Sequence, residues 1–118
     1  MCIRQLGHPT FKHLISLPIK QACLQKLSFA SKGDFNAVEK VSEISSYSQV
    51  CALSRAEYKD IDAAGLALSK AKKPRIHTGI GTSDSHIKHK FNSNRNDILE
   101  RAVKAVKYAK NFVDDIEF

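Results

Sequence analysis

The chain has 118 residues, of which 42% are hydrophobic and 26% charged, with 19 Lys and Arg against 12 Asp and Glu. This composition is typical of one small globular domain or part of a larger one, and it excludes collagen-like, low-complexity and wholly disordered proteins. No apolar run approaches the roughly 20 residues that span a bilayer. Lys12, His13 and Lys20 interrupt the N-terminal apolar stretches, so we expect no signal peptide, no membrane partner and a cytoplasmic location.

The positive charge is concentrated near the N-terminus. Residues 1–32 contain five basic residues and no acidic ones, whereas residues 33–118 contain 14 basic and 12 acidic residues. A nucleic-acid-binding module usually carries its basic residues on a folded face, beside aromatic side chains or a recognition helix. Because the excess here lies in a segment without clear periodicity, we expect no nucleic-acid partner.

The three cysteines, Cys2, Cys23 and Cys51, are an odd number, lie far apart in the chain and form no CxxC motif. This pattern indicates neither a disulfide framework nor a zinc site. We therefore expect the thiols to pack as small apolar groups.

From about residue 29 onward, the spacing of apolar residues predicts helices and strands in alternation. Asp34 is placed to cap a first helix, in which apolar residues recur at spacings of three up to Ile44. Residues 49–53 form a short apolar run bounded by serines, as in a buried strand. A second helix follows through Tyr58 and Leu68, and we expect Pro74 to stop it.

The same order then repeats. Residues 75–81 indicate a strand that runs into a polar loop. Ser93 is placed to cap a third helix, whose apolar stripe includes Ile98, Leu99 and Val103 and extends to Val113. Residues 115–118 then indicate the start of a further strand.

Such alternation implies an α/β fold with a parallel sheet covered by helices. A complete (β/α)8 TIM barrel takes about 250 residues, so we interpret the chain as a fragment of such a barrel with about three parallel strands. Residues 1–28, which Pro9 and Pro18 interrupt, show no such pattern. We expect them to be a poorly ordered segment outside the barrel domain.

Four segments resemble, in order, motifs of the 2-isopropylmalate synthase family. The longest is RIHTGIGTSDSH at 75–86, which resembles the family's RIHTFIATSxxH. The others are ASKGDF at 30–35, CALSRA at 51–56, and ERAVKAVKYA at 100–109 with DDIEF at 114–118. The resemblance implies that residues 29–118 are part of a pyruvate carboxyltransferase-like TIM-barrel domain.

The resemblance also implies an acyltransferase of leucine biosynthesis. Enzymes of this family condense acetyl-CoA with 2-oxoisovalerate: an enolate attacks the keto carbon, and thioester hydrolysis then releases CoA. A divalent metal, Mg²⁺ or Mn²⁺, polarises the keto acid and stabilises the developing alkoxide. A homodimer, with its site at the C-terminal ends of the barrel strands, is implied as well.

The family holds its metal with an Asp in an RDG motif and with an HxH pair, and neither motif occurs in these 118 residues. Without those ligands, nothing anchors the keto acid or absorbs the developing charge. We therefore predict no metal ligand and no catalytic residue in this chain, and no synthase activity of the chain in isolation.

Two residues are candidate substrate-binding groups. His77 matches the family's barrel-lining histidine, and strand alternation points it away from Ile76 and Thr78. Its alternative role is that of a hydrogen-bonded core histidine. Arg55 ends the preceding strand, where barrel loops face the substrate, and a surface salt bridge is its alternative role.

Other positions bear on metal binding and specificity. His86 and His89 have the spacing of a metal-binding pair, but two ligands are too few for zinc. Gly79 and Gly81 stand where relatives often carry Phe and Ala. The smaller glycines would enlarge the space beside the candidate histidine. Glu117 stands where homocitrate synthases tend to carry Arg, and it favours the isopropylmalate branch.

Three other functions stay open. The first is a related citramalate or methylthioalkylmalate synthase, which would accept a different keto acid. The second is a noncatalytic fragment that associates with a full-length synthase through its open sheet edges. The third is a small basic nucleic-acid binder.

Overall fold

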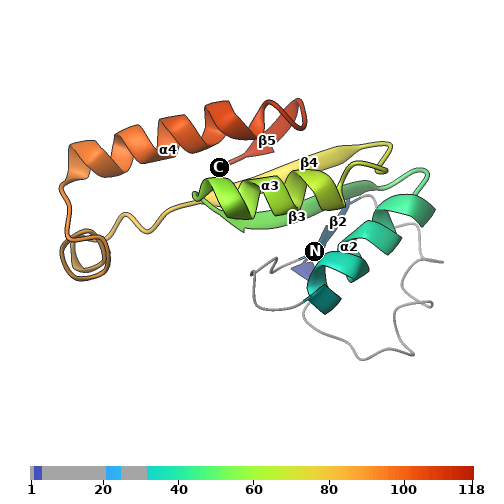
Figure 1. Ribbon diagram of the computed structural model, residues 1–118, viewed down its shortest axis with the longest axis horizontal. Helices are drawn as coiled ribbons and strands as arrows, with labels where there is room; N and C mark the ends of the chain where they lie inside the picture. Colours follow the sequence, from blue (N-terminus) through green and yellow to red (C-terminus); the bar gives the residue numbers. More distant parts are fainter. Residues whose placement is uncertain (1, 4–20, 25–31) are drawn as a thin grey trace.

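The computed structural model describes residues 2–3, 21–24 and 32–118, which form one parallel sheet and a layer of helices (Figure 1). The strands are β1 (Cys2–Ile3), β2 (Gln21–Leu24), β3 (Gln49–Arg55), β4 (Pro74–Gly79) and β5 (Asp115–Glu117). The helices are α2 (Lys32–Ile44), α3 (Tyr58–Ala67) and α4 (Arg95–Ala109), and a short π-helical turn, His86–Lys90, precedes α4.

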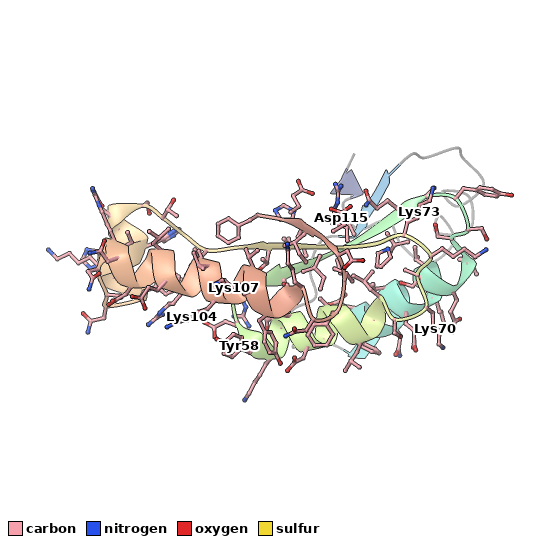
Figure 2. The ribbon with its side chains drawn as sticks, turned by 90° about the horizontal axis from the view of Figure 1, so that it is seen from above. Tyr58, Lys70, Lys73, Lys104, Lys107 and Asp115 are labelled. Atoms are coloured by element: carbon pink, nitrogen blue, oxygen red, sulfur yellow. The ribbon has the colours of Figure 1, made fainter. Side chains whose placement is uncertain are left out.

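The strand order explains which class of α/β fold this is. All five strands are parallel and lie in chain order, β1-β2-β3-β4-β5. The three helices lie on one side of the sheet (Figure 2). A doubly wound fold would reverse its strand order and carry helices on both faces. A singly wound sheet with one helical layer is instead the arrangement within a (β/α)8 barrel.

The predicted strands and the observed ones agree for the second half of the chain. The strands expected at 49–53, 75–81 and 115–118 are confirmed as β3, β4 and β5. β1 and β2 add two strands to the three expected, and both come from residues 1–28. The rest of that segment, which we expected to be poorly ordered, lies outside the described residues.

The helix boundaries differ from the predicted ones in their capping residues. α2 begins at Lys32, so Asp34 lies in its first turn, where a carboxylate favours the positive end of the helix dipole. α4 is capped by Asn94, whose side chain accepts a hydrogen bond of 2.9 Å from the backbone N–H of Asp97. Ser93, the predicted cap, donates its hydroxyl to the Asp97 carboxylate instead.

The end of α3 also differs from the prediction. The helix ends at Ala67, well before Pro74, and Pro74 is the first residue of β4. Proline is tolerated at the first position of a strand because no ladder hydrogen bond is lost there. Pro74 therefore begins a strand rather than stopping a helix.

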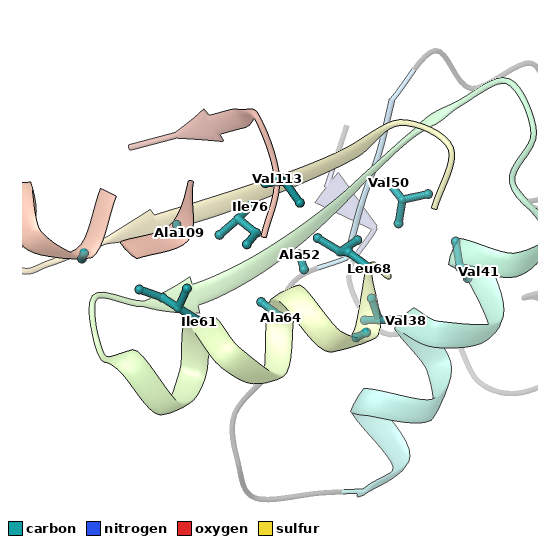
Figure 3. Packing of buried hydrophobic residues seen from close by; sticks show 12 residues of the cluster. Val38, Val41, Val50, Ala52, Ile61, Ala64, Leu68, Ile76, Ala109 and Val113 are labelled. Atoms are coloured by element: carbon teal, nitrogen blue, oxygen red, sulfur yellow. The ribbon is translucent and has the colours of Figure 1, made fainter. Parts of the chain in front are cut away.

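The hydrophobic core lies between the helices and one face of the sheet (Figure 3). Val50 and Ala52 of β3, Ile76 of β4 and Ile61 of α3 are all fully buried there. Burying one such Val or Ile side chain is worth about 1.5–3 kcal/mol. Because side chains alternate along a strand, the residues between these core positions belong to the other face of the sheet.

The apolar stripe predicted for α4 is only partly buried. Ile98 and Ala109 are buried, whereas Leu99 and Val103 are 64% and 44% exposed. The helix packs mainly on α3 and β4, so only a narrow stripe of its surface meets the core. No helix in the described part of the chain combines the length and apolar character needed to cross a membrane.

Candidate functional site

The face of the sheet opposite the helices is polar, and we call it the polar face. Its residues form two neighbouring rows across β3, β4 and β5, and the residues of each row are paired in the strand register. Asp115 lies on this side of the sheet, whereas Tyr58 and Lys70 lie on the helical side (Figure 2). In a (β/α)8 barrel this face lines the interior, and the active site lies at the C-terminal ends of its strands. The two rows are Cys51, Arg75 and Asp115, followed by Leu53, His77 and Glu117.

Arg75 is the centre of an ion-pair network on the polar face. Its guanidinium lies 2.9 Å from a carboxylate oxygen of Asp115 and donates to Glu117 at 3.4 Å. Gln49 also donates its side-chain N–H to Asp115. The hydrogen bond with Asp115 raises the pKa of Arg75, and the same bond, assisted by Gln49, lowers the pKa of Asp115. These contacts connect side chains of β3, β4 and β5 across the polar face.

His77 lies beside two other potential metal ligands. One ligand atom each of His77, Cys51 and Glu117 lies within 4.8 Å of the others. Cys51 is fully buried, as expected for a thiol that packs like a small apolar group. His77 is half-buried and Glu117 is exposed, so the cluster extends from the interior to the surface at the end of β5.

The predicted orientation of His77 is confirmed. Ile76 and Thr78, its neighbours in β4, are fully buried, and Ile76 belongs to the core beneath the helices. His77 instead joins Cys51 and Glu117 on the polar face. It therefore lies outside the core beneath the helices, and its contact with substrate stays a prediction.

Arg55 is engaged in an ion pair with Asp60. Its Nε lies 2.5 Å from one carboxylate oxygen of Asp60, and its Nη2 donates to the other at 3.2 Å. This hydrogen-bonded pair raises the pKa of Arg55. The Asp60 side chain is 2% exposed and that of Arg55 is 68% exposed, so the guanidinium compensates a buried carboxylate in the first turn of α3. The structure thus shows the salt bridge that was the alternative role of Arg55, and substrate binding by Arg55 stays a prediction.

The two glycines that follow His77 differ in the space around them. A Cβ built on Gly79 would meet nothing within 4 Å, so there is open space beside this position as expected. A Cβ on Gly81 would collide with the imidazole of His86, so the expected space at Gly81 is filled. Within the described residues, His86 and His89 are exposed and belong to no cluster of three ligands.

Comparison with known proteins identifies the family. Residues 13–118 match the HMGL-like family. The chain belongs to the HMGL-like family. Proteins of the HMGL-like family are TIM barrels, so the singly wound sheet of β1 to β5 is an arc of a (β/α)8 barrel. The polar face is therefore the side that lines a barrel interior.

Curated relatives of this HMGL-like chain carry one name. The chain is 58% identical over 89 residues to the 2-isopropylmalate synthase of Parabacteroides distasonis, covering 75% of this chain and 18% of the relative. It is 53% identical to that of Shewanella frigidimarina and 48% identical to that of Aliarcobacter butzleri, in each case over 75% of this chain and 17% of the relative. The chain thus spans about a fifth of the length of these relatives.

HMGL-like enzymes generally use a divalent metal, so the donor atoms of the described residues bear on whether this segment can hold Mg²⁺ or Mn²⁺. These ions prefer six oxygen ligands in octahedral geometry. The one cluster of three ligands in the described parts of the chain offers a sulfur, a nitrogen and an oxygen, from Cys51, His77 and Glu117. This donor set does not fit Mg²⁺ or Mn²⁺, and no reaction step is assigned to such an ion on these residues.

Proposed function

We propose that this chain acts as part of a 2-isopropylmalate synthase, the acyltransferase that condenses acetyl-CoA with 2-oxoisovalerate in leucine biosynthesis. The observation that carries the proposal is the 58% identity over 89 residues to a relative of that name. The polar face supports it, because Arg55, His77 and Glu117 lie on it toward the carboxyl ends of β3, β4 and β5, where barrel enzymes bind their substrates.

His77 has the strongest case for contact with substrate. It lies next to Glu117 in the strand register and beside the open space at Gly79. An imidazole in this position can donate a hydrogen bond to a keto or carboxylate oxygen of the bound keto acid. Arg55 pairs with Gly79 at the same edge of the sheet. Because its guanidinium already binds Asp60, we propose that a substrate carboxylate would compete with that carboxylate for it.

We propose that the groups that bind the metal and the second substrate lie outside this segment. A bound Mg²⁺ or Mn²⁺ would supply Lewis-acid stabilisation of the developing alkoxide, held by the RDG and HxH motifs that these 118 residues lack. We therefore propose that the chain alone does not turn over acetyl-CoA and 2-oxoisovalerate. The synthase activity, in the cytoplasm and as a homodimer, requires a barrel that contains those metal ligands.

Two assays of CoA release test this proposal. The isolated chain, supplied with acetyl-CoA, 2-oxoisovalerate and Mg²⁺, should release no CoA above background. A chimera, in which the matched segment replaces its counterpart in the Parabacteroides distasonis enzyme, should be active with 2-oxoisovalerate. A folded but inactive chimera would contradict the proposal.

The same chimera separates the closest alternative. A related citramalate or methylthioalkylmalate synthase would accept a different keto acid. Gly79 gives this alternative a physical basis, because the open space where a Cβ would lie leaves room for a different keto-acid side chain. A chimera that prefers a different keto acid over 2-oxoisovalerate would assign the segment to such a branch.

A further inference from the structure

Cys51, His77 and Glu117 bring three different donor atoms together on three adjacent strands. The atoms lie within 4.8 Å of one another. Tetrahedral zinc holds sulfur at about 2.3 Å and nitrogen or oxygen at about 2.0–2.2 Å, which places its ligand atoms about 3.6 Å apart. For the cluster to close around an ion, side-chain rotations therefore need to move the ligand atoms by about an ångström. The strand register does not need to change.

We propose that Cys51, His77 and Glu117 form a binding site for a thiophilic divalent cation of the Zn²⁺ class. Thiolate and imidazole ligands select zinc or cobalt over magnesium, whereas an all-oxygen cage would do the reverse. Three protein ligands leave a fourth tetrahedral position for water. The site is thus distinct in chemistry from the Mg²⁺ or Mn²⁺ centre that the synthase requires.

The sheet holds the three ligands in a fixed arrangement. His77 and Glu117 are paired in register across β4 and β5, and Cys51 lies two residues before Leu53, the β3 partner of His77. Ligands on neighbouring strands are positioned more precisely than ligands on loops. Access is from the exposed Glu117 side, because Cys51 is fully buried and His77 half-buried.

The ion pair of Glu117 with Arg75 opposes metal binding only weakly. Glu117 interacts with Arg75 at 3.4 Å, and its side chain is 47% exposed, so this pair is a weak surface ion pair. Arg75 keeps its shorter contact, 2.9 Å, with Asp115 when Glu117 turns towards the ion. The guanidinium also lies near enough to the side chain of Cys51 for their electrostatic interaction to contribute to the raised pKa of Arg75.

The proposal does not rest on the proposed function, because the isolated chain can be tested without synthase activity. Co²⁺ is titrated into a Cys2→Ser/Cys23→Ser chain, in which Cys51 is the remaining thiol, and absorption is followed in a non-chelating buffer. We expect one Co²⁺ per chain, a thiolate-to-cobalt charge-transfer band, intense visible bands of tetrahedral cobalt, and loss of all of them when Zn²⁺ is added.

Variants identify the ligands. Cys51→Ser should abolish the charge-transfer band, and His77→Gln should weaken Co²⁺ binding by at least about 10–100-fold, the loss seen when even an outer-shell partner is removed. Glu117→Gln tests the exposed ligand with the least risk to folding. His86→Gln/His89→Gln is the matched control and should leave both the affinity and the spectrum unchanged, with far-UV circular dichroism checking the fold of each variant.

Several results would overturn the proposal. They are no Co²⁺ binding by the folded chain, a bound cobalt spectrum without a thiolate band, or binding that survives both His77→Gln and Glu117→Gln. Binding that disappears in the His86→Gln/His89→Gln control would place the ion on the π-helical turn and would equally overturn it.

Discussion

The two faces of the sheet are built from the same strands but are held together by different forces. On the helical face, Val50 and Ala52 of β3 and Ile76 of β4 are fully buried against α3 and its neighbours. On the polar face, the residues between them carry a thiol, an imidazole and paired charges. The comparison shows that alternate residues of one strand can serve stability and function separately, because their side chains lie on opposite sides of the sheet.

The polar face is ordered by its own contacts. Arg75 connects Asp115 and Glu117 of β5 to β4, and Gln49 connects β3 to Asp115. Such exposed pairs contribute little to stability one at a time. Substitutions on this face should therefore change chemistry more than folding, and substitutions on the helical face should do the opposite.

The largest stability effect is expected on the helical face. Ile76→Ala removes a fully buried side chain from the centre of the sheet and should cost about 2–5 kcal/mol of unfolding free energy. Leu99→Ala, at a position 64% exposed, should change it by about 0.5 kcal/mol or less. Urea denaturation followed by circular dichroism measures both. Equal losses of unfolding free energy in the two variants would show that Leu99 is buried and that α4 packs with a different stripe from the one described here.

A smaller effect on stability is expected at Arg55, the last residue of β3. Arg55→Ala leaves the buried carboxylate of Asp60 without its ion-pair partner, so it should lower the thermal midpoint, though less than Ile76→Ala does. The control is Arg95→Ala, which breaks an ion pair with Asp84 in which both side chains are exposed. If both arginine variants melt alike, the pair with Asp60 is not structural, and the predicted substrate role of Arg55 gains support.

The smallest stability effect belongs to the polar face and depends on pH. The pKa of Asp115 is lowered from 3.8, chiefly by Arg75, so its pairing stabilises the fold at neutral pH, and this stabilisation is lost as pH falls below 3.8. Asp115→Asn should lower the unfolding free energy near pH 7 by about 0–1 kcal/mol. Denaturation from pH 7 to pH 2 should show the two proteins converging. A difference that stays constant with pH would mean that the ion pair does not form.

Much of this architecture is predictable from the sequence, because it depends on local periodicity. The spacing of apolar residues predicts β3, α3, β4 and α4, and alternation around Ile76 places His77 on the face away from the core. Capping is less predictable, since Ser93 and Asn94 are adjacent and both are favourable capping residues.

The cluster of Cys51, His77 and Glu117 could not be predicted in the same way. Its members lie on three strands separated by helices, and which residues meet depends on the strand register, which tertiary packing fixes. A salt bridge was the alternative role expected for Arg55, but its partner Asp60 could not be predicted, because the pairing depends on how the first turn of α3 packs against the end of β3. Alternation within each strand places Cys51, His77 and Glu117 away from the core positions Val50, Ile76 and Ile116, but alternation alone does not align the strands.

The most direct test of the account is the kinetics of His77→Ala in the chimera with the Parabacteroides distasonis enzyme, with His89→Gln as the matched control. If the polar face lines the active site, kcat/KM for 2-oxoisovalerate should fall at least about tenfold in His77→Ala, with an unchanged circular dichroism spectrum. His89→Gln, on the exposed π-helical turn, should match the parent chimera. A folded His77→Ala chimera with the kcat/KM of its parent would contradict the assignment of this face to the substrate.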